Sequence, residues 1–205
     1  MNYLDIIHHF YPEDTPLRRL LLLHSECVRD KALQILEGSG FRGLVSGFRV
    51  QGSNLNLDLI IAGSMLHDIG ICATHAPGIL CEGTEPYICH GTIGARMLRQ
   101  LVAEGSFSAE DAAMLEACAR ICERHTGAGL TRQDILSQGL PIEPAVDLLP
   151  ETLEEQLVCL ADKFFSKSGD PRKEKSLEHV RRSMMKFGAD SLARFDALCS
   201  TFNIK

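Results

Sequence analysis

The chain has 205 residues, of which 45% are hydrophobic and 23% are charged. This length predicts one full-sized domain, and this composition supports a sizeable apolar core and excludes a chain that is disordered throughout. The 27 acidic and 21 basic side chains give a net charge of −6. Because a nucleic-acid surface needs a basic footprint, we expect no extended nucleic-acid surface.

No segment reaches the roughly 18–20 apolar residues that span a bilayer, so we expect no membrane span. The first ten residues include Asp5, His8 and His9 but no basic segment, which is unlike a signal peptide. We therefore expect a cytoplasmic protein whose eight cysteines stay reduced and are mostly small buried side chains. The eight histidines are the feature of the composition that needs an explanation.

Helical patterns follow one another along the chain, which predicts an all-α fold in the form of a single multi-helix bundle. Thr15 followed by Pro16 is typical of a helix start, and that helix is predicted to end at Gly38 or Gly40. The glycine-rich segment 38–53 is predicted to be a loop, with a short hairpin as the alternative. A strongly apolar helix is predicted over 54–66, followed by Gly70 in a left-handed conformation.

The segment 73–86 contains prolines and glycines and is predicted to be irregular. Apolar periodicity and capping residues then predict helical segments over 87–104, 108–124, 131–138, 152–168, 176–187 and 190–202. We divide the chain into an N-terminal helical extension (1–14), a main domain (15–170) and C-terminal helices that pack on the same domain (171–205).

The strongest local signal is His67-Asp68-Ile69-Gly70, directly after the apolar helix. Burying an unpaired carboxylate is strongly unfavourable, so something must compensate the charge of Asp68. Adjacent helix residues point about 100° apart, so His67 and Asp68 can reach around one ion or two adjacent ions.

Four other polar residues are embedded in, or end, apolar helical segments: His24, His90, His125 and Asp162. Four imidazoles and two carboxylates suit Fe, Mn, Co, Ni or Zn. We therefore predict a metal site formed by His24, His67, Asp68, His90, His125 and Asp162. The remaining histidines are predicted to have surface or structural roles: His8, His9, His75 and His179.

This ordered set of residues resembles the HD-domain metal-dependent phosphohydrolases, particularly the HDIG subgroup, over about residues 18–167. In pattern the chain is most similar to the binuclear HD-type diadenosine tetraphosphate hydrolases and to uncharacterised HDIG proteins. The resemblance implies an all-helical fold in which His24, His67, Asp68 and Asp162 hold one divalent transition metal. It also implies that Asp68 bridges to a second ion, which His90 and His125 bind. Fe or Mn is preferred from the resemblance, and Co, Ni and Zn stay open.

The resemblance implies an enzyme that cleaves a phosphate ester or anhydride of a small, nucleotide-like substrate by attack of metal-bound hydroxide. His67 and Asp68 would be its catalytic residues. The alternatives are a di-iron oxygenase of the HD fold and a non-catalytic regulatory HD module. The chain departs from the subgroup at Ile71, where many HDIG proteins carry a phosphate-binding lysine. It also has no Gly-Tyr-Pro signature, which argues against the cyclic-dinucleotide phosphodiesterase branch.

The charge that holds the substrate phosphate must therefore come from elsewhere. The candidates are basic residues close to the predicted ligands: Arg18, Arg19, Lys163 and Lys167. We expect a small phosphorylated molecule as the partner, and the sequence leaves the oligomeric state open, a homodimer included.

Overall fold

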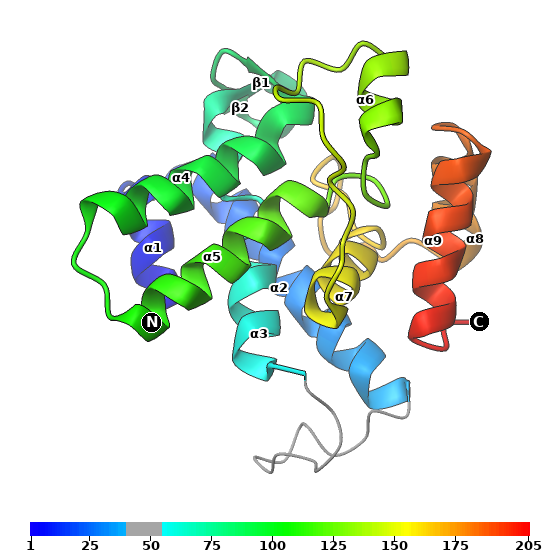
Figure 1. Cartoon of the computed structure of the whole chain (residues 1–205), viewed down its shortest axis with the longest axis horizontal. Coiled ribbons are helices and arrows are strands. Elements are labelled where there is room, and N and C mark those ends of the chain that lie inside the picture. The colour runs from blue at the N-terminus through cyan, green and yellow to red at the C-terminus, as the bar shows by residue number, and fades with distance from the viewer. Residues whose placement is uncertain (40–54) are drawn as a thin grey trace.

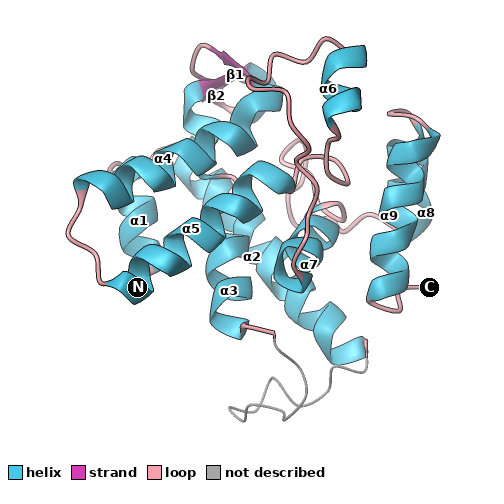
Figure 2. Cartoon of the chain, viewed as in Figure 1, coloured by secondary structure: helices cyan, strands magenta, loops and turns pink. Residues whose placement is uncertain are grey.

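The computed structural model describes residues 1–39 and 55–205. The predicted loop or hairpin lies outside the described residues from position 40 onward, as does the predicted helix start at Asn54. Helices dominate the described chain, which confirms the all-α fold class (Figures 1 and 2). They are α1 (Tyr3–Phe10), α2 (Pro16–Gly38), α3 (Leu57–Leu66), α4 (His90–Glu104), α5 (Ala109–Arg124), α6 (Arg132–Ser137), α7 (Leu153–Asp162), α8 (Leu177–Met185) and α9 (Ala189–Thr201).

Helix starts follow the capping residues of the sequence. The Thr15 side chain accepts a hydrogen bond from the backbone N–H of Arg18, and Pro16 occupies the first turn of α2. Thr152 and Glu155 form a complete capping box at the start of α7. Ser108 caps α5, whose first turn is acidic. The sequence therefore predicted these starts well, because each depends on a local side-chain hydrogen bond.

The helix predicted over 54–66 begins at Leu57, because the side chain of Asn56 caps it. Two further helices are shorter than predicted. Residues 87–89 form a separate 3₁₀ turn, so α4 begins at His90. Helix α7 ends at Asp162 rather than near residue 168, because the chain tightens there: the N–H of Phe165 bonds the carbonyl of Asp162, three residues back. Both helix ends thus coincide with a predicted metal ligand.

The segment predicted to be irregular contains a small three-stranded sheet in the order β2-β1-β3, of which Figure 2 labels β1 and β2. Strand β1 (Thr74–Ala76) pairs antiparallel with β2 (Cys81–Glu82), with His75 opposite Glu82. It pairs parallel with β3 (Glu85–Pro86). Strands of two or three residues are too short to leave an alternating pattern in the sequence.

Gly70 does not adopt the predicted left-handed conformation, since it is not among the glycines with positive φ. Its missing side chain instead permits close packing. A Cβ atom at Gly70 would lie 2.3 Å from the carbonyl oxygen of His90 and 2.4 Å from the backbone nitrogen of Gly94. The turn after His67 and Asp68 therefore lies directly against the first turns of α4.

Two large apolar clusters form most of the described core. One gathers the N-terminal half of α2 with α1, α3, α4 and α5, and includes Leu21 and Leu66. The other gathers the C-terminal half of α2 with α7, α8 and α9, and includes Val28 and Ala161. Helix α2 runs through both clusters, and the two chain ends lie at opposite sides of the molecule (Figure 1). His24 falls between the two halves of α2, where the two clusters meet.

All eight cysteines are free thiols, as predicted, and six of them are buried. Within the described ranges, no helix combines the length and the apolar character that crossing a bilayer requires.

Candidate metal centre

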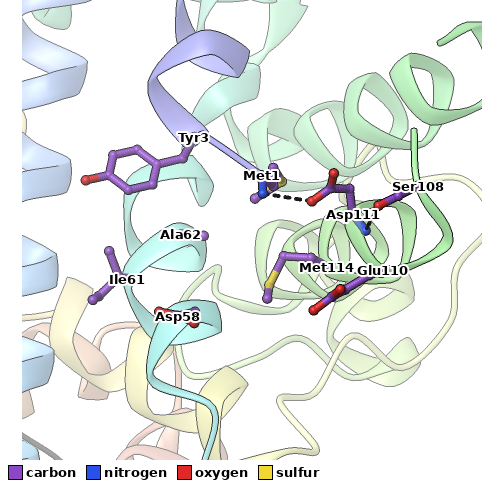
Figure 3. A pocket seen from close by; sticks show the side chains of 9 residues that line it. All are labelled: Met1, Tyr3, Asp58, Ile61, Ala62, Ser108, Glu110, Asp111 and Met114. Carbon is purple, nitrogen blue, oxygen red and sulfur yellow. Dashed lines mark hydrogen bonds and ion pairs between the residues drawn. The ribbon is translucent and has the colours of Figure 1, made fainter. Parts of the chain in front are cut away.

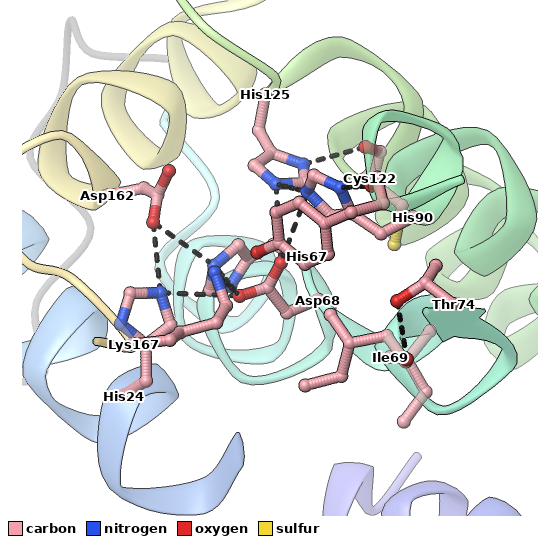
Figure 4. Close-up of polar contacts among 12 residues, drawn as sticks. His24, His67, Asp68, Ile69, Thr74, His90, Cys122, His125, Asp162 and Lys167 are labelled. Carbon is pink, nitrogen blue, oxygen red and sulfur yellow. Dashed lines mark hydrogen bonds and ion pairs between the residues drawn. The ribbon is translucent and has the colours of Figure 1, made fainter. Parts of the chain in front are cut away.

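Five of the six predicted ligands lie at the ends of helices or just beyond them. His67 ends α3, and Asp68 follows it in the turn that leads into a 3₁₀ segment. His90 is the first residue of α4, and Asp162 is the last residue of α7. His125 directly follows α5, whereas His24 lies within α2. These helix ends converge on one place, which Figure 4 shows.

Burial separates the predicted ligands from the other histidines. His67 and Asp68 have no exposed surface, and the remaining four ligands are at most 9% exposed. By contrast, the histidines predicted to have no role in the site are all exposed: His8, His9, His75 and His179. Polar and charged groups are rarely buried without partners or a bound ion. Burial thus divides the eight histidines into four buried and four exposed, and the four buried ones are the predicted ligands.

The first ligand group consists of His24, His67, Asp68 and Asp162. Its donor atoms lie within 4.8 Å of one another. The Nε2 atom of His24 lies 3.0 Å from Oδ1 of Asp162 and 3.3 Å from Oδ2 of Asp68. The Nε2 atom of His67 lies 3.1 Å from the same Asp68 oxygen. Two histidine nitrogens therefore lie at Oδ2 of Asp68, and Oδ1 of Asp162 lies against both of those histidines.

The second group consists of Asp68, His90 and His125, and it uses the other oxygen of Asp68. Oδ1 lies 3.4 Å from Nε2 of His90 and 3.5 Å from Nε2 of His125. Asp68 thus stands between the two groups and presents one carboxylate oxygen to each (Figure 4).

Three of the histidines are oriented in the same way. The Nδ1 atoms of His67, His90 and His125 each lie 2.7 Å from the backbone carbonyl three residues earlier. A carbonyl can only accept, so Nδ1 must carry the proton, and in the neutral ring Nε2 then has a free lone pair. Metal-binding histidines are commonly held in this manner.

Several donor atoms of the cluster have no hydrogen-bond partner among the described residues. Nε2 of His67 and both carboxylate oxygens of Asp68 are buried and have no hydrogen bond of normal geometry, although cationic and imidazole nitrogens lie nearby. Nε2 of His90 lies 3.0 Å from Nε2 of His125. Two nitrogens bound at about 2.1 Å to one ion lie about 3 Å apart when the bonds are at right angles. The residues therefore fit divalent ions.

The electrostatics of the cluster keep both carboxylates ionised. Burial alone would raise the pKa of Asp68, but the charges of His67 and Lys167 outweigh it and hold the pKa well below its usual range. Burial is likewise outweighed at Asp162, chiefly by Lys163. Burial lowers the pKa of His67, yet Asp68 and Asp162 together raise it to about 9. Burial lowers the pKa of His90 to about 3.

Two of the predicted phosphate-binding residues reach the cluster. The Lys167 ammonium lies 2.6 Å from Oδ2 of Asp68, and the side chain is 9% exposed. The Lys163 ammonium lies 2.7 Å from Oδ2 of Asp162 and donates to the carbonyl of His125. The sequence placed Lys167 one helical turn beyond Asp162, but α7 has ended by then, and a tighter turn brings Lys167 to Asp68 instead.

The other two candidates contact different residues. Arg18 donates to the carbonyl of Pro12, and Arg19 forms a surface ion pair of 2.7 Å with Asp14. Neither contacts a member of the cluster in the described chain. Both side chains turn back towards the loop before α2, because nearby acceptors satisfy them there.

Tyr87 also borders the cluster, although the sequence did not indicate it. Its ring stacks on His90 with 4.7 Å between the ring centroids, and the Lys167 ammonium lies 6.0 Å from its centroid. Its backbone carbonyl is the acceptor that orients His90. The only signal in the sequence was the position of Tyr87 three residues before His90. That position is informative only once His90 is taken as a ligand.

A pocket lies elsewhere, between the N-terminus and the helices α3 and α5 (Figure 3). Tyr3, Ile61 and Met114 line it, and the amino group of Met1 forms an ion pair of 2.7 Å with Asp111 there. It contains none of the predicted site residues, so the buried cluster is the stronger candidate for the functional site.

Comparison with known proteins decides the family. The family model described as HD domain matches residues 21–166, which is well over half of the chain. The chain belongs to the HD domain family. This match contains all six predicted ligands, and it places the chain in a superfamily of metal-dependent hydrolases whose HD domains bind divalent metals.

Curated relatives of this HD protein match it only over part of their length. An uncharacterised protein of Methanocaldococcus jannaschii is 36% identical over 119 residues, which cover 58% of this chain and 56% of the relative. Two proteins named tRNA (cytidine(56)-2′-O)-methyltransferase are also similar. That of Thermoplasma volcanium is 28% identical over 73% of this chain and 37% of its own length. That of Picrophilus torridus is 34% identical over 53% of this chain and 24% of its own length. No solved structure matches the chain.

Proposed function

We propose that the chain is a metal-dependent phosphohydrolase that holds two divalent ions in the buried cluster. The observation that carries this proposal is the position of Asp68, whose two oxygens each face a separate group of ligands. His24, His67 and Asp162 would complete the first site, and His90 and His125 the second. Mixed nitrogen and oxygen ligands suit Fe or Mn and also permit Co, Ni or Zn.

A pair of bound divalent ions would lower the pKa of a water molecule and neutralise charge on the phosphoryl oxygens. The protein's own contribution is to fix the ligands before the ions arrive. Carbonyl acceptors hold the rings of His67, His90 and His125 so that Nε2 of each faces the cluster. The buried surroundings exclude bulk water, which strengthens every charge interaction in the site.

Lys167 is the side chain that we assign to the substrate phosphate. It supplies the positive charge that Ile71 cannot, and its ammonium already lies at the carboxylate between the two ligand groups. An ammonium and bound cations together favour a phosphate ester or anhydride, and the ring of Tyr87 beside them favours a nucleotide-like substrate. The acidic net charge does not oppose this, because the charges within the site act at short range.

The name of the two longer relatives is not transferred to this chain. The chain matches 37% and 24% of their lengths, so the printed activity belongs to proteins with much additional sequence. The alternatives of a di-iron oxygenase and of a non-catalytic regulatory module make different experimental predictions from a hydrolase.

The test is a hydrolysis panel with protein that has been stripped by a chelator and reloaded with one metal at a time. The substrates are a phosphomonoester, a phosphodiester, a cyclic nucleotide and a dinucleoside polyphosphate. We expect metal-dependent release of product from at least one class, and its loss by at least about 100-fold in Asp68→Asn. Asp58→Asn is the matched control, since Asp58 lies on the adjoining helix and is exposed.

Full activity in Asp68→Asn would contradict the bridging role of Asp68. Bound metal with no hydrolysis of any substrate would contradict the hydrolase. Consumption of oxygen by the iron-loaded protein would then support the oxygenase, and its absence would support the regulatory module.

A further inference from the structure

Two lysines four residues apart reach the ligand cluster, and their surroundings differ. Lys163 directly follows α7, whose last residue is Asp162, and Lys167 lies beyond the tight turn that ends the helix. Their side chains are 8% and 9% exposed, so both ammonium groups are buried. A buried ammonium is costly unless its donors are satisfied, so the partners of each lysine indicate what it does.

The partners of Lys163 belong to both ligand groups. Its Nζ lies 2.7 Å from Oδ2 of Asp162, a member of the first group. The same Nζ donates, at 2.9 Å, to the backbone carbonyl of His125, a member of the second group. This carbonyl lies just past the end of α5, so one ammonium joins the ends of two helices that each supply a ligand.

A third lysine, Lys175, holds the backbone around Lys163. The Lys175 ammonium donates to the carbonyl oxygens of Lys163 and Phe165, and the Lys175 N–H bonds the carbonyl of Phe164 at 2.8 Å. Carbonyls at the C-terminal end of a helix have no partners within it, and a lysine is a favourable partner for them. The backbone that carries Lys163 is therefore held at three consecutive carbonyls.

Lys167 has a single acidic partner in the cluster, Oδ2 of Asp68, at 2.6 Å. That contact does not meet the geometry of a hydrogen bond, since both Asp68 oxygens have no hydrogen-bond partner. Its ammonium also lies at the Tyr87 ring, on the border of the cluster. Lys167 can therefore exchange its one carboxylate contact for a phosphate oxygen, whereas Lys163 is already held by both a carboxylate and a carbonyl.

From these contacts we infer that the two lysines have different roles: Lys163 is a positioning residue that sets the spacing of the two ligand groups, and Lys167 alone binds substrate phosphate. This inference rests on the proposed function, and it removes Lys163 from the candidate phosphate-binding residues. An ammonium with one carboxylate and one carbonyl partner retains one donor hydrogen at most. Its loss should therefore disturb Asp162 and His125 rather than the substrate.

The experiment compares Lys163→Met with Lys167→Met in the full chain. Binding of Co(II) is measured by titration and by the visible spectrum, which reports ligand geometry, and binding of inorganic phosphate is measured on the Co(II)-loaded protein. We expect Lys163→Met to weaken Co(II) binding by about 10-fold or more and to change the spectrum. Phosphate affinity of the fully loaded Lys163→Met protein should stay within about twofold of the parent. Lys167→Met should show the reverse, with Co(II) affinity equal to or above that of the parent and phosphate affinity reduced about 10-fold.

Lys173→Met is the control, because Lys173 is an exposed lysine that lies shortly after Lys167 in the sequence. Lys163→Arg provides a folded comparison if Lys163→Met does not fold, since arginine keeps the donors but changes their geometry. A shifted Co(II) spectrum in Lys163→Arg with unchanged phosphate affinity supports positioning. Parental Co(II) binding with weakened phosphate binding, in either Lys163 variant, overturns it. If the parent binds no Co(II), the proposed function itself fails. If the parent binds Co(II) and Lys163→Met binds Co(II) and phosphate as the parent does, only the inference about Lys163 fails.

Discussion

At the residue scale, the site brings together buried donor atoms, several of which have no hydrogen-bond partner among the described residues. Nε2 of His90 faces Nε2 of His125 at 3.0 Å, and both carboxylate oxygens of Asp68 are buried without hydrogen bonds. Lone pairs that converge in a buried space are the arrangement that a metal ion stabilises. The arrangement is therefore better explained by ion binding than by stability of the fold.

The pKa of His67 leads to a prediction about pH. Asp68 and Asp162 outweigh burial and raise this pKa to about 9, so His67 carries a proton at neutral pH. An ion can bind only the neutral ring, so binding must release that proton. The apparent affinity for metal should rise about tenfold for each pH unit up to about pH 9. Titration calorimetry in buffers of different ionisation enthalpy measures the released proton, and affinity that is flat between about pH 6.5 and 8.5 would refute this assignment.

The sequence was most informative about which polar residues are buried. His67-Asp68 beside an apolar helix predicted a buried charge, and the other predicted ligands stood out because each interrupts or ends an apolar segment. It could not separate Arg18 from Lys167, because both lie near a ligand in sequence. Arg18 turns to the carbonyl of Pro12, and Lys167 reaches Asp68 only because α7 ends early. Such outcomes depend on long-range packing.

At the scale of elements, the site depends on how closely helix ends approach. The turn that carries Asp68 packs against α4 at Gly70, where no side chain fits. The sequence predicted the helices and their caps, which depend on local contacts. It misjudged Gly70 because a left-handed helix end and a close backbone approach both favour glycine, and only the packing distinguishes them.

Substitution of Gly70 tests this approach. A Cβ atom there would meet two backbone atoms of α4 closer than 2.5 Å, one of them at 2.3 Å, and backbone cannot move aside cheaply. Gly70→Ala should lower the free energy of unfolding by about 1–3 kcal/mol. It should also weaken metal binding, because a shift of the turn would move Asp68 away from His90. Denaturant unfolding measures the first effect. Gly78→Ala, where nothing lies within 4 Å, should change stability by less than about 0.5 kcal/mol. Equal stability of the two variants would contradict the packing argument.

Helix α1 reaches the same turn through Tyr11. The Tyr11 hydroxyl donates to the carbonyl of Ile69 at 2.8 Å and accepts from the N–H of Cys72 at 3.1 Å, and the residue is buried. The segment directly after Asp68 is thus fixed by the N-terminal residues. The division of the chain at residue 14 stays a prediction, but residues 1–14 contribute to the site's surroundings.

Tyr11→Phe removes both hydrogen bonds, one to the carbonyl of Ile69 and one from the N–H of Cys72. We expect a loss of about 1–3 kcal/mol in the free energy of unfolding. Tyr3→Phe, at the start of α1, is the control, since no hydrogen bond of the Tyr3 hydroxyl is found among the described residues and its removal should be nearly neutral. Chemical denaturation of both variants checks the difference, and a stable Tyr11→Phe protein would show that α1 does not hold the turn.

At the scale of the whole molecule, the ligands join segments from His24 to Asp162, and they lie where the two apolar clusters meet. An ion bound at this cluster would bind the folded chain and not the unfolded chain, because unfolding separates the ligands. Metal should therefore stabilise the entire domain, and the two halves of the core should unfold together.

Loading with metal at about 100 times its dissociation constant should add about 2.7 kcal/mol of stability. For a chain of this size, that corresponds to a rise of about 5–10 °C in the melting temperature. Differential scanning calorimetry with and without chelator measures it. Asp68→Asn, which should retain at most one ion, should show a clearly smaller rise, while Asp58→Asn should behave as the parent does. A melting temperature that is independent of metal in the parent would contradict ion binding across the two clusters.

The most direct test of the central claim is the number of ions that one chain binds. Stripped protein is loaded with Mn(II) or Fe(II) without oxygen, freed of excess metal and measured by elemental analysis. Two ions per chain in the parent and at most one in Asp68→Asn are the predicted result, because Asp68 is the ligand that both groups share. A parent that retains no ion, or an Asp68→Asn protein that retains two, would contradict it.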